Sequence, residues 1–177
     1  MLAKAWEVLL LFLIPIGGGI PGGVVLAQKH GFSWQIMTLL YFISDVILAI
    51  LFEPCLLLFL RYSKNIPRLA RVRDALAKST SRTVSQYGIN PGPFSLIMIT
   101  FGTDPMTGRS VAKAANHGFL TGWTLTIIGD MLFFLVLMAS TLWLNNILGD
   151  GTLTAVIIMV LMIAVPPLVR RIMGKTK

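Results

Sequence analysis

Charged residues are scarce in this sequence. Asp, Glu, Lys and Arg make up 12% of its 177 residues, whereas a soluble domain carries roughly 25%. Hydrophobic residues reach 55%, and the mean hydropathy is +0.80. The chain therefore lacks the polar surface that keeps a domain in water, and its composition predicts an integral membrane protein embedded in a lipid bilayer.

Cysteine is almost absent as well. The single Cys55 excludes a disulfide or a thiolate metal site within one chain. The sequence shows neither a serine–histidine–acid order nor a paired metal-ligand spacing. We therefore expect no enzyme activity, no metal and no cofactor.

Acidic residues are few, and the basic residues gather in two places. There are 7 acidic against 15 basic residues, a formal net charge of +8. Residues 61–92 hold Arg61, Lys64, Arg68, Arg71, Arg73, Lys78 and Arg82, and the C-terminus holds Arg170, Arg171, Lys175 and Lys177. Such clusters beside membrane segments mark the cytoplasmic side, here of the inner (plasma) membrane. No aromatic residues interleave with the basic run, so nucleic acid is not an expected partner.

Long hydrophobic runs are what the sequence does have. Three of them, Trp34–Leu60, Leu120–Leu144 and Thr152–Val169, suit the roughly 30 Å of a bilayer core. Two more, Val8–Leu26 and Phe94–Ala115, are shorter and interrupted by glycine and proline. As full spans these two would put the basic clusters on opposite faces, so we predict re-entrant hairpins instead. The expected hairpin tips contain Gly18, Gly19, Pro21 and Gly22, and Gly102, Pro105 and Gly108.

A repeat aligns the two halves of the chain. His-Gly-Phe occurs at His30–Phe32 and at His117–Phe119, each time between a broken stretch and a long run with a lone aspartate. Paired halves with interrupted helices are a common plan of transporters. We predict an all-α, polytopic membrane protein with two inverted repeats, each a broken re-entrant hairpin plus a long transmembrane helix, and a C-terminal transmembrane helix. The expected single membrane domain divides into repeat 1 at about 5–60, a cytoplasmic loop at 61–92, repeat 2 at about 93–146 and a final helix at about 152–170.

The lone aspartates are the first candidates for a functional site. Asp45 and Asp130 both fall near the bilayer midplane, where a carboxylate costs about 2.5–3.5 kcal/mol and normally faces a cavity or a partner. They are candidates for binding a proton, a coupling ion or the substrate. The alternative is a structural aspartate, hydrogen-bonded to Ser44 or to freed backbone.

Glu53 is a further candidate. It follows Asp45 by eight residues, so both share one helix face. Its counterpart in the second half is the apolar Met138. The alternative is a glutamate near the inner end of its helix that pairs with Arg61.

Three charged residues surround the second hairpin tip. Asp104 and Arg109 flank it, and Lys113 follows one turn later. The simplest interpretation is an ion pair between Asp104 and Arg109 that locks the tip. In the other interpretation, Arg109 and Lys113 bind an anionic head group beside the N-terminus of the returning half-helix.

Several motifs carry a family resemblance. Gly18-Gly19-Ile20-Pro21 in the first half, and Tyr87-Gly88, Pro105-x-Thr107-Gly108 and the alanines up to Ala115 in the second, resemble the small multidrug export protein family. The element from Pro105 to Arg109 is similar, more distantly, to the DedA/VTT superfamily. The first resemblance implies transport without fixing a substrate, and the second implies translocation of an anionic lipid carrier.

The function predicted from the sequence is secondary transport. A small solute, ion or drug-like molecule would cross between the two hairpins, coupled to a proton or another cation, in a homodimer. The alternatives are a DedA-like lipid translocase, a small ion channel and a membrane scaffold that transports nothing.

Overall fold

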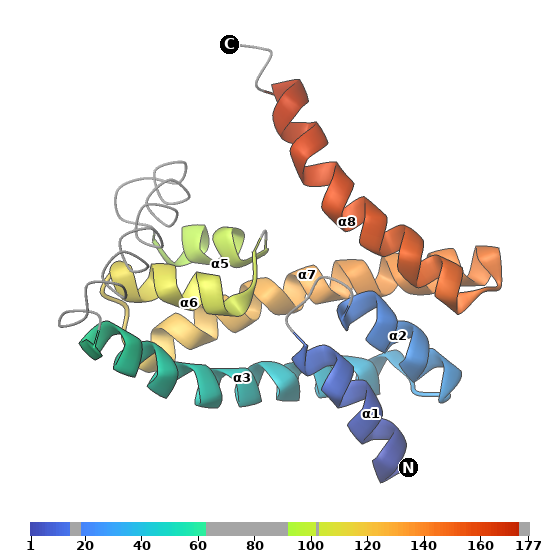
Figure 1. The fold of residues 1–177 in the computed structure, drawn as a ribbon, viewed down its shortest axis with the longest axis horizontal. Helices are drawn as coiled ribbons and strands as arrows, with labels where there is room; N and C mark the ends of the chain where they lie inside the picture. The colour runs from blue at the N-terminus through green and yellow to red at the C-terminus, as the bar shows by residue number, and fades with distance from the viewer. Residues whose placement is uncertain (15–18, 63–91, 102, 174–177) are drawn as a thin grey trace. The chain divides into compact units, whose positions relative to one another are not determined.

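The computed structural model describes residues 1–14, 19–62, 92–101 and 103–173. Their regular secondary structure is all helical, in the order α1 (Leu2–Leu13), α2 (Gly19–Lys29), α3 (Trp34–Tyr62), α5 (Pro93–Phe101), α6 (Pro105–Ala114), α7 (Phe119–Leu148) and α8 (Gly151–Met173) (Figure 1). The all-helical prediction is therefore confirmed for this part of the chain. The predicted tip residues Gly18 and Gly102, and residues 63–91 of the predicted loop, lie outside the described residues.

Within the described residues, two helices are long and apolar enough to cross a membrane. They are α3, whose apolar part is Trp34–Phe59, and α7 over all of Phe119–Leu148. They match two of the three spans predicted from the sequence. The third predicted span, Thr152–Val169, lies inside the 23-residue helix α8.

The distribution of side chains along α3 and α7 fits this setting. Large apolar residues point outward, among them Leu39, Ile50, Leu51, Leu132 and Val136, whereas the buried residues of these helices include the three carboxylic acids Asp45, Glu53 and Asp130. A protein in water normally does the opposite, since buried charged groups are rare and large exposed apolar patches mark an interaction surface. Together with the two long apolar helices, this arrangement indicates a membrane location.

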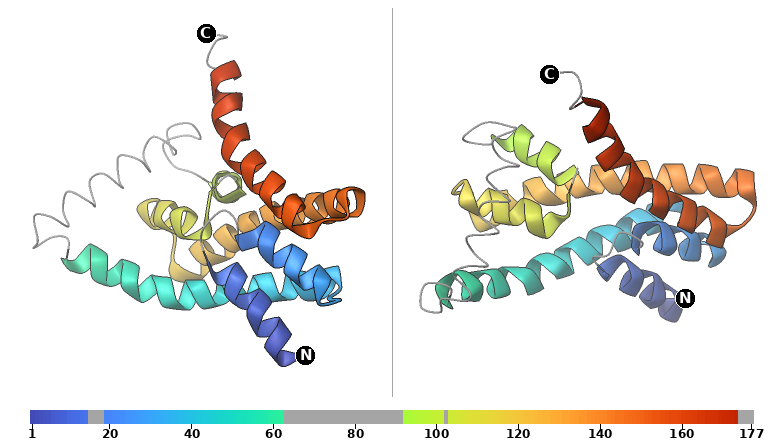
Figure 2. Two further views of the ribbon diagram at one scale, coloured as in Figure 1. Left: turned by 45° about the vertical axis from the view of Figure 1, so that its right-hand side comes forward. Right: turned by 45° about the horizontal axis from the view of Figure 1, so that its top comes forward.

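The chain divides into two compact units. The first comprises Met1–Ser44 and Phe134–Lys177, and the second comprises Asp45–Phe133. Each unit therefore contains one pair of short helices, one half of α3 and one half of α7. In the first unit α1 packs on α2 and α2 packs on α8, and in the second α5 packs on α6 (Figure 2).

An aromatic cluster forms the core of the first unit. The rings of Tyr41 and Phe134 stack with their centroids 4.0 Å apart, and the ring of Phe12 meets both edge-on at 5.3 and 5.6 Å. Stacked and edge-to-face pairs are the favoured aromatic geometries. They join α1, the first half of α3 and the second half of α7.

A smaller apolar cluster forms the core of the second unit. Leu96 and Ile99 of α5 pack against Val111 and Ala112 of α6, with Leu125 of α7 alongside. Thr100 and Thr126 are fully buried beside them, and their hydroxyls donate to carbonyls of their own helices. Such local bonds satisfy a buried hydroxyl without a partner on another helix.

Helices α3 and α7 run antiparallel within each unit (Figure 1). In the second unit Asp45 of α3 lies near Asp130 of α7, and Glu53 further along α3 accepts a hydrogen bond from Trp123 earlier in α7. In this unit, residue numbers therefore rise along α3 as they fall along α7.

The two halves share one register of 85 residues. α3 begins at Trp34 and α7 at Phe119, α2 ends at Lys29 and α6 at Ala114, and Asp45 corresponds to Asp130. The turns that end α2 and α6 also correspond. A left-handed residue, Gly31 (φ 76°) or Asn116 (φ 61°), is followed by an N–H that reaches back five residues, Phe32 to Ala27 and His117 to Ala112.

The repeated His-Gly-Phe is out of this register. Its two copies lie 87 residues apart, so the second copy begins two positions late relative to the structural repeat. The tripeptide marks the exit of each hairpin, but its two copies do not occupy equivalent positions. The equivalent positions are fixed by the positive φ angle, which glycine and asparagine tolerate best.

Candidate functional site

Asp45 and Asp130 meet in the second unit. Each side chain is only 2% exposed, and the two carboxyl groups lie near enough to interact electrostatically. We call them the carboxyl pair. One oxygen of Asp45, Oδ2, is buried without a hydrogen-bond partner in the described part of the chain. The two aspartates that the repeat marked as counterparts therefore lie close together.

This proximity determines what the carboxyl pair can do chemically. Two ionised carboxylates that lie close together in a buried site repel each other strongly. Carboxyl pairs of this kind can relieve the repulsion by sharing one proton, and taking up and releasing such a proton is what a proton carrier does.

Ser44 is not the partner of Asp45. The hydroxyl of Ser44, one of the expected partners of Asp45, donates instead to the carbonyl of Tyr41 at 2.6 Å. Gly129, next to Asp130, allows α5 to approach α7 closely, because a Cβ there would lie 2.5 Å from the Ile97 carbonyl oxygen. Buried polar atoms are normally satisfied, so the unpaired Asp45 Oδ2 calls for an explanation.

Glu53 forms a second buried polar site with Arg109. The Arg109 Nε donates to Glu53 Oε2 at 2.8 Å and its Nη2 donates to Oε1 at 2.7 Å. Arg109 is 0% and Glu53 7% exposed. This two-point geometry is the strongest form of a carboxylate–guanidinium pair. Breaking such a buried pair by removing one partner costs about 3–5 kcal/mol.

The remaining Arg109 nitrogen is also engaged. Nη1 donates to the carbonyls of His117 and Gly118 at 3.3 and 3.4 Å. The guanidinium passes over Gly122, where a Cβ would clash with Nη1. Glycine at position 122 is therefore what allows a full-length arginine to reach across the start of α7.

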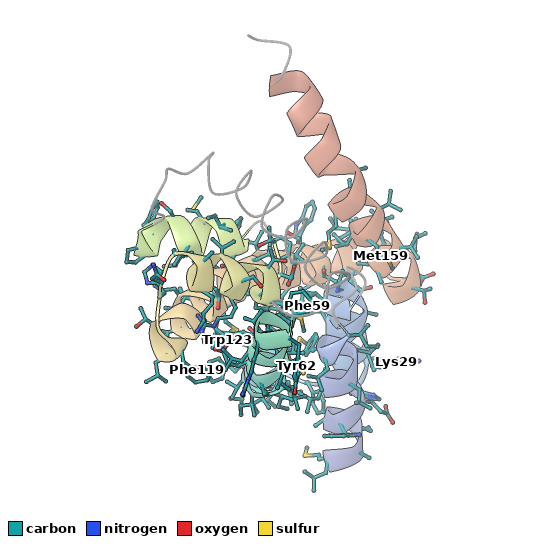
Figure 3. The ribbon with its side chains drawn as sticks, turned by 60° about the vertical axis from the view of Figure 1, so that its left-hand side comes forward. Lys29, Phe59, Tyr62, Phe119, Trp123 and Met159 are labelled. Carbon is teal, nitrogen blue, oxygen red and sulfur yellow. The ribbon has the colours of Figure 1, made fainter. Side chains whose placement is uncertain are left out.

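Trp123 completes this site and was missed in the sequence. Its indole Nε1 donates to Glu53 Oε2 at 2.9 Å, and its side chain lies beside α3 (Figure 3). A signal for it existed, because Trp123 precedes Asp130 by seven residues and so shares its helix face. A buried tryptophan also needs an acceptor for its N–H. We call Glu53, Arg109 and Trp123 the Glu53 cluster.

The expected ion pair between Asp104 and Arg109 is wrong, as is the pairing of Glu53 with Arg61. Asp104 is the N-cap of α6, and its carboxylate accepts from the backbone N–H and the hydroxyl of Thr107 at 2.8 and 2.6 Å. A capping carboxylate faces the first turn of its own helix. Arg109, five residues on, points to another side and finds Glu53.

The remaining predicted tip residues lie inside helices rather than at the chain reversals. Gly19, Pro21 and Gly22 belong to α2, and Pro105 and Gly108 to α6, with Pro105 at its first position, which is favourable for proline because the missing N–H would be unpaired there. Gly23 and Gly108, one register apart, are the positions of close packing. A Cβ would meet the Phe12 ring in one unit and the Thr100 hydroxyl in the other.

The side chains of Lys113 and His30 are not hydrogen-bonded to either polar site in the described part of the chain, and His117 contributes a backbone carbonyl to the second. Lys113 lies in the last turn of α6 and is partly exposed. His30 is bonded to Glu7 at 3.1 Å in the first unit, and the backbone carbonyl of His117 is an acceptor for Arg109. Among the described residues no group of three or more His, Cys, Asp or Glu is placed to hold a metal ion.

Comparisons with protein-family models, with curated proteins and with solved structures found no match for this chain.

Proposed function

We propose that this protein is a secondary transporter of the inner membrane, in which the carboxyl pair carries the coupling proton and binds a cation. The observation that carries this proposal is the proximity of Asp45 to Asp130, buried between two helices long and apolar enough to cross a membrane. Ionisable residues inside membrane segments mark ion paths and proton relays in transporters.

The charge balance of the buried groups favours a cation over an anion. The buried ionisable side chains of the described chain are Asp45, Glu53, Asp130 and Arg109. Arg109 neutralises Glu53, which leaves the carboxyl pair with one negative charge when it holds one proton. A second proton or a monovalent cation would neutralise that charge, and the unpaired Asp45 Oδ2 is the oxygen available to it.

The same contacts weigh against an anionic lipid carrier as the substrate. An anion site needs free donors, and the Arg109 guanidinium already donates to Glu53 and to two backbone carbonyls. Lys113 alone is a single charge at the end of α6. The DedA-like alternative would therefore require Arg109 to leave a buried two-point ion pair.

The antiparallel course of α3 and α7 supports the inverted arrangement of the two halves. Inverted repeats place the same helix in opposite directions across the membrane. With the basic residues 61–92 and the basic C-terminus on the cytoplasmic side, the C-terminal end of α3 and the N-terminal end of α7 face the cytoplasm. The resemblance to small multidrug export proteins is consistent with transport, and a homodimer would cover part of the exposed apolar surface.

Reconstitution in liposomes with an internal pH probe tests this proposal. We expect the wild-type protein to move protons in exchange for an added monovalent cation, and Asp45→Asn and Asp130→Asn to reduce that flux by at least about tenfold, because each removes a proton-binding group. Asp104→Asn, an exposed carboxylate outside both sites, is the matched control. Equal flux in wild type and both variants across inorganic and organic cations would refute the proposed site.

Two further readings in the same liposomes separate the alternatives. Flux of labelled anionic lipid without proton movement would favour the translocase. Cation conductance that needs no proton gradient and survives Asp45→Asn would favour a channel.

A further inference from the structure

The Glu53 cluster lies between the carboxyl pair and the C-terminal end of α3. Glu53 follows Asp45 by eight residues on α3, which places it about 12 Å further along the helix axis at 1.5 Å per residue. Trp123 precedes Asp130 by seven residues on the antiparallel α7. The cluster therefore ties α3, α6 and α7 together one layer beyond the carboxyl pair.

The first unit has no such cluster at the equivalent positions. The register of 85 residues pairs Glu53 with Met138, Arg109 with Val24 and Trp123 with Thr38. Val24 and Met138 are buried apolar side chains, and the Thr38 hydroxyl donates to the Trp34 carbonyl of its own helix at 2.8 Å. The repeat is thus symmetric in its helices but not in its charges.

This asymmetry has a mechanical consequence. Apolar side chains slide past one another while remaining in contact, because dispersion contacts are weak individually and have no required partner. A buried two-point ion pair separates only by leaving two charges without partners. The two units therefore differ in how readily their short helices can part from α3 and α7.

We propose that the Glu53 cluster is a gate that closes the carboxyl pair on the side of the α3 C-terminus. The proposal rests on the transport function proposed above and adds the sidedness of its site. With the α3 C-terminus in the cytoplasm, the resting protein is closed to the cytoplasm and admits ions from the outer side. Glu53, Arg109 and Trp123 act as positioning residues, since none of them belongs to the carboxyl pair.

Replacing the cluster by its own counterpart gives a direct test. The triple variant Glu53→Met, Arg109→Val, Trp123→Thr introduces the residues that the first unit already uses. Apolar replacement of a whole buried ion pair is often neutral or stabilising, so the variant is suited to fold. A reporter cysteine at Ala49, buried on α3 between Asp45 and Glu53, is placed in a Cys55→Ser background and labelled with a membrane-impermeant thiol reagent in sided vesicles.

With the native cluster, we expect Ala49→Cys to be protected from reagent added on the cytoplasmic side. In the triple variant its labelling rate should rise at least about tenfold, because a larger fraction of the molecules would have the gate open. Arg109→Lys keeps the charge but loses the two-point geometry, so its rate should rise by a smaller factor, about threefold. A cysteine at Ile50, which is exposed on the apolar surface, is the control and should stay unlabelled throughout.

An unchanged rate in both the folded triple variant and Arg109→Lys would show that the cluster is a structural contact and not a gate. Increased labelling from the outer side alone would contradict the proposed side. These readings need no transport, so they remain valid if the Asp45→Asn flux experiment fails. If the labelling rate is unchanged but Asp45→Asn loses flux, the gate is refuted while the proposed transport function is retained.

Discussion

At the residue scale, the structure reassigns partners among residues that the sequence had already marked. Four ionisable residues stand out in the sequence because such groups are costly inside apolar runs and usually have a function there. They are Asp45, Glu53, Arg109 and Asp130. Their pairing could not be read from the sequence. Arg109 reaches Glu53, 56 positions earlier in the chain, and only the packing of α6 between α3 and α7 brings them together.

Gly122 gives the sharpest test of that packing. In Gly122→Ala the new Cβ meets Arg109 Nη1 and lies 3.3 Å from the Ala112 Cβ, so the guanidinium must shift. We expect a loss of about 1–3 kcal/mol of stability, typical of overpacking a filled site, measured by thermal unfolding in detergent. Gly118→Ala has open space around its Cβ and should change stability little. Equal effects of the two variants would contradict the described course of Arg109.

Variants of Asp104 test whether this residue only caps α6 or also takes part in transport. Asp104→Ala removes the acceptor for the Thr107 N–H and should cost about 1 kcal/mol, as the loss of an N-cap usually does. Asp104→Asn keeps an acceptor oxygen and should restore most of the stability and all of the flux. Loss of flux in Asp104→Asn at normal thermal stability would return this residue to the transport site.

At the element scale, the sequence predicts the long helices well and the hairpins less well. Apolar length alone places α3 and α7 within a few residues of their ends, because the bilayer thickness dictates that length. In the hairpins, glycine and proline indicated chain reversals, yet most of these residues lie inside α2 and α6. Glycine serves there for close packing between helices as well as for turns, and sequence alone does not separate the two uses.

Gly22 and Gly23 allow the close-packing role of glycine to be tested within one helix, α2. A Cβ at Gly23 would clash with the Phe12 ring, whereas nothing lies within 4 Å of one at Gly22. Gly23→Ala should destabilise the α1–α2 pair by about 1–3 kcal/mol. Gly22→Ala should be neutral or stabilise by up to about 1 kcal/mol, since alanine favours the helix. Thermal unfolding of both variants measures the difference, and a more damaging Gly22→Ala would contradict the packing of α1 on α2.

At the scale of the whole molecule, the structural repeat is the organising feature. A shift of 85 residues relates Trp34 to Phe119, Gly23 to Gly108 and Asp45 to Asp130. In the sequence, the repeat is visible as two His-Gly-Phe tripeptides, but these are offset by two positions from the structural repeat. The equivalent residues are Gly31 and Asn116, and they are recognised by their positive φ angles.

The proposed inverted orientation makes a prediction for intact cells. In a Cys55→Ser background, a cysteine at position 79 should be inaccessible to an impermeant thiol reagent added outside, because the proposal puts the basic segment on the cytoplasmic side. A cysteine at Lys29, which is exposed at the end of α2, should be labelled. Labelling of position 79 from outside would overturn the proposed orientation.

The central claim is that Asp45 and Asp130 share a proton inside the membrane, and infrared spectroscopy of the reconstituted protein tests it most directly. A protonated carboxyl has a C=O stretching band that an ionised carboxylate lacks. At neutral pH we predict such a band in the wild-type protein, shifted in D₂O, absent in the double variant Asp45→Asn, Asp130→Asn, and unchanged in Asp104→Asn. A wild-type spectrum without a protonated carboxyl, or a band that survives in the double variant, would contradict the account.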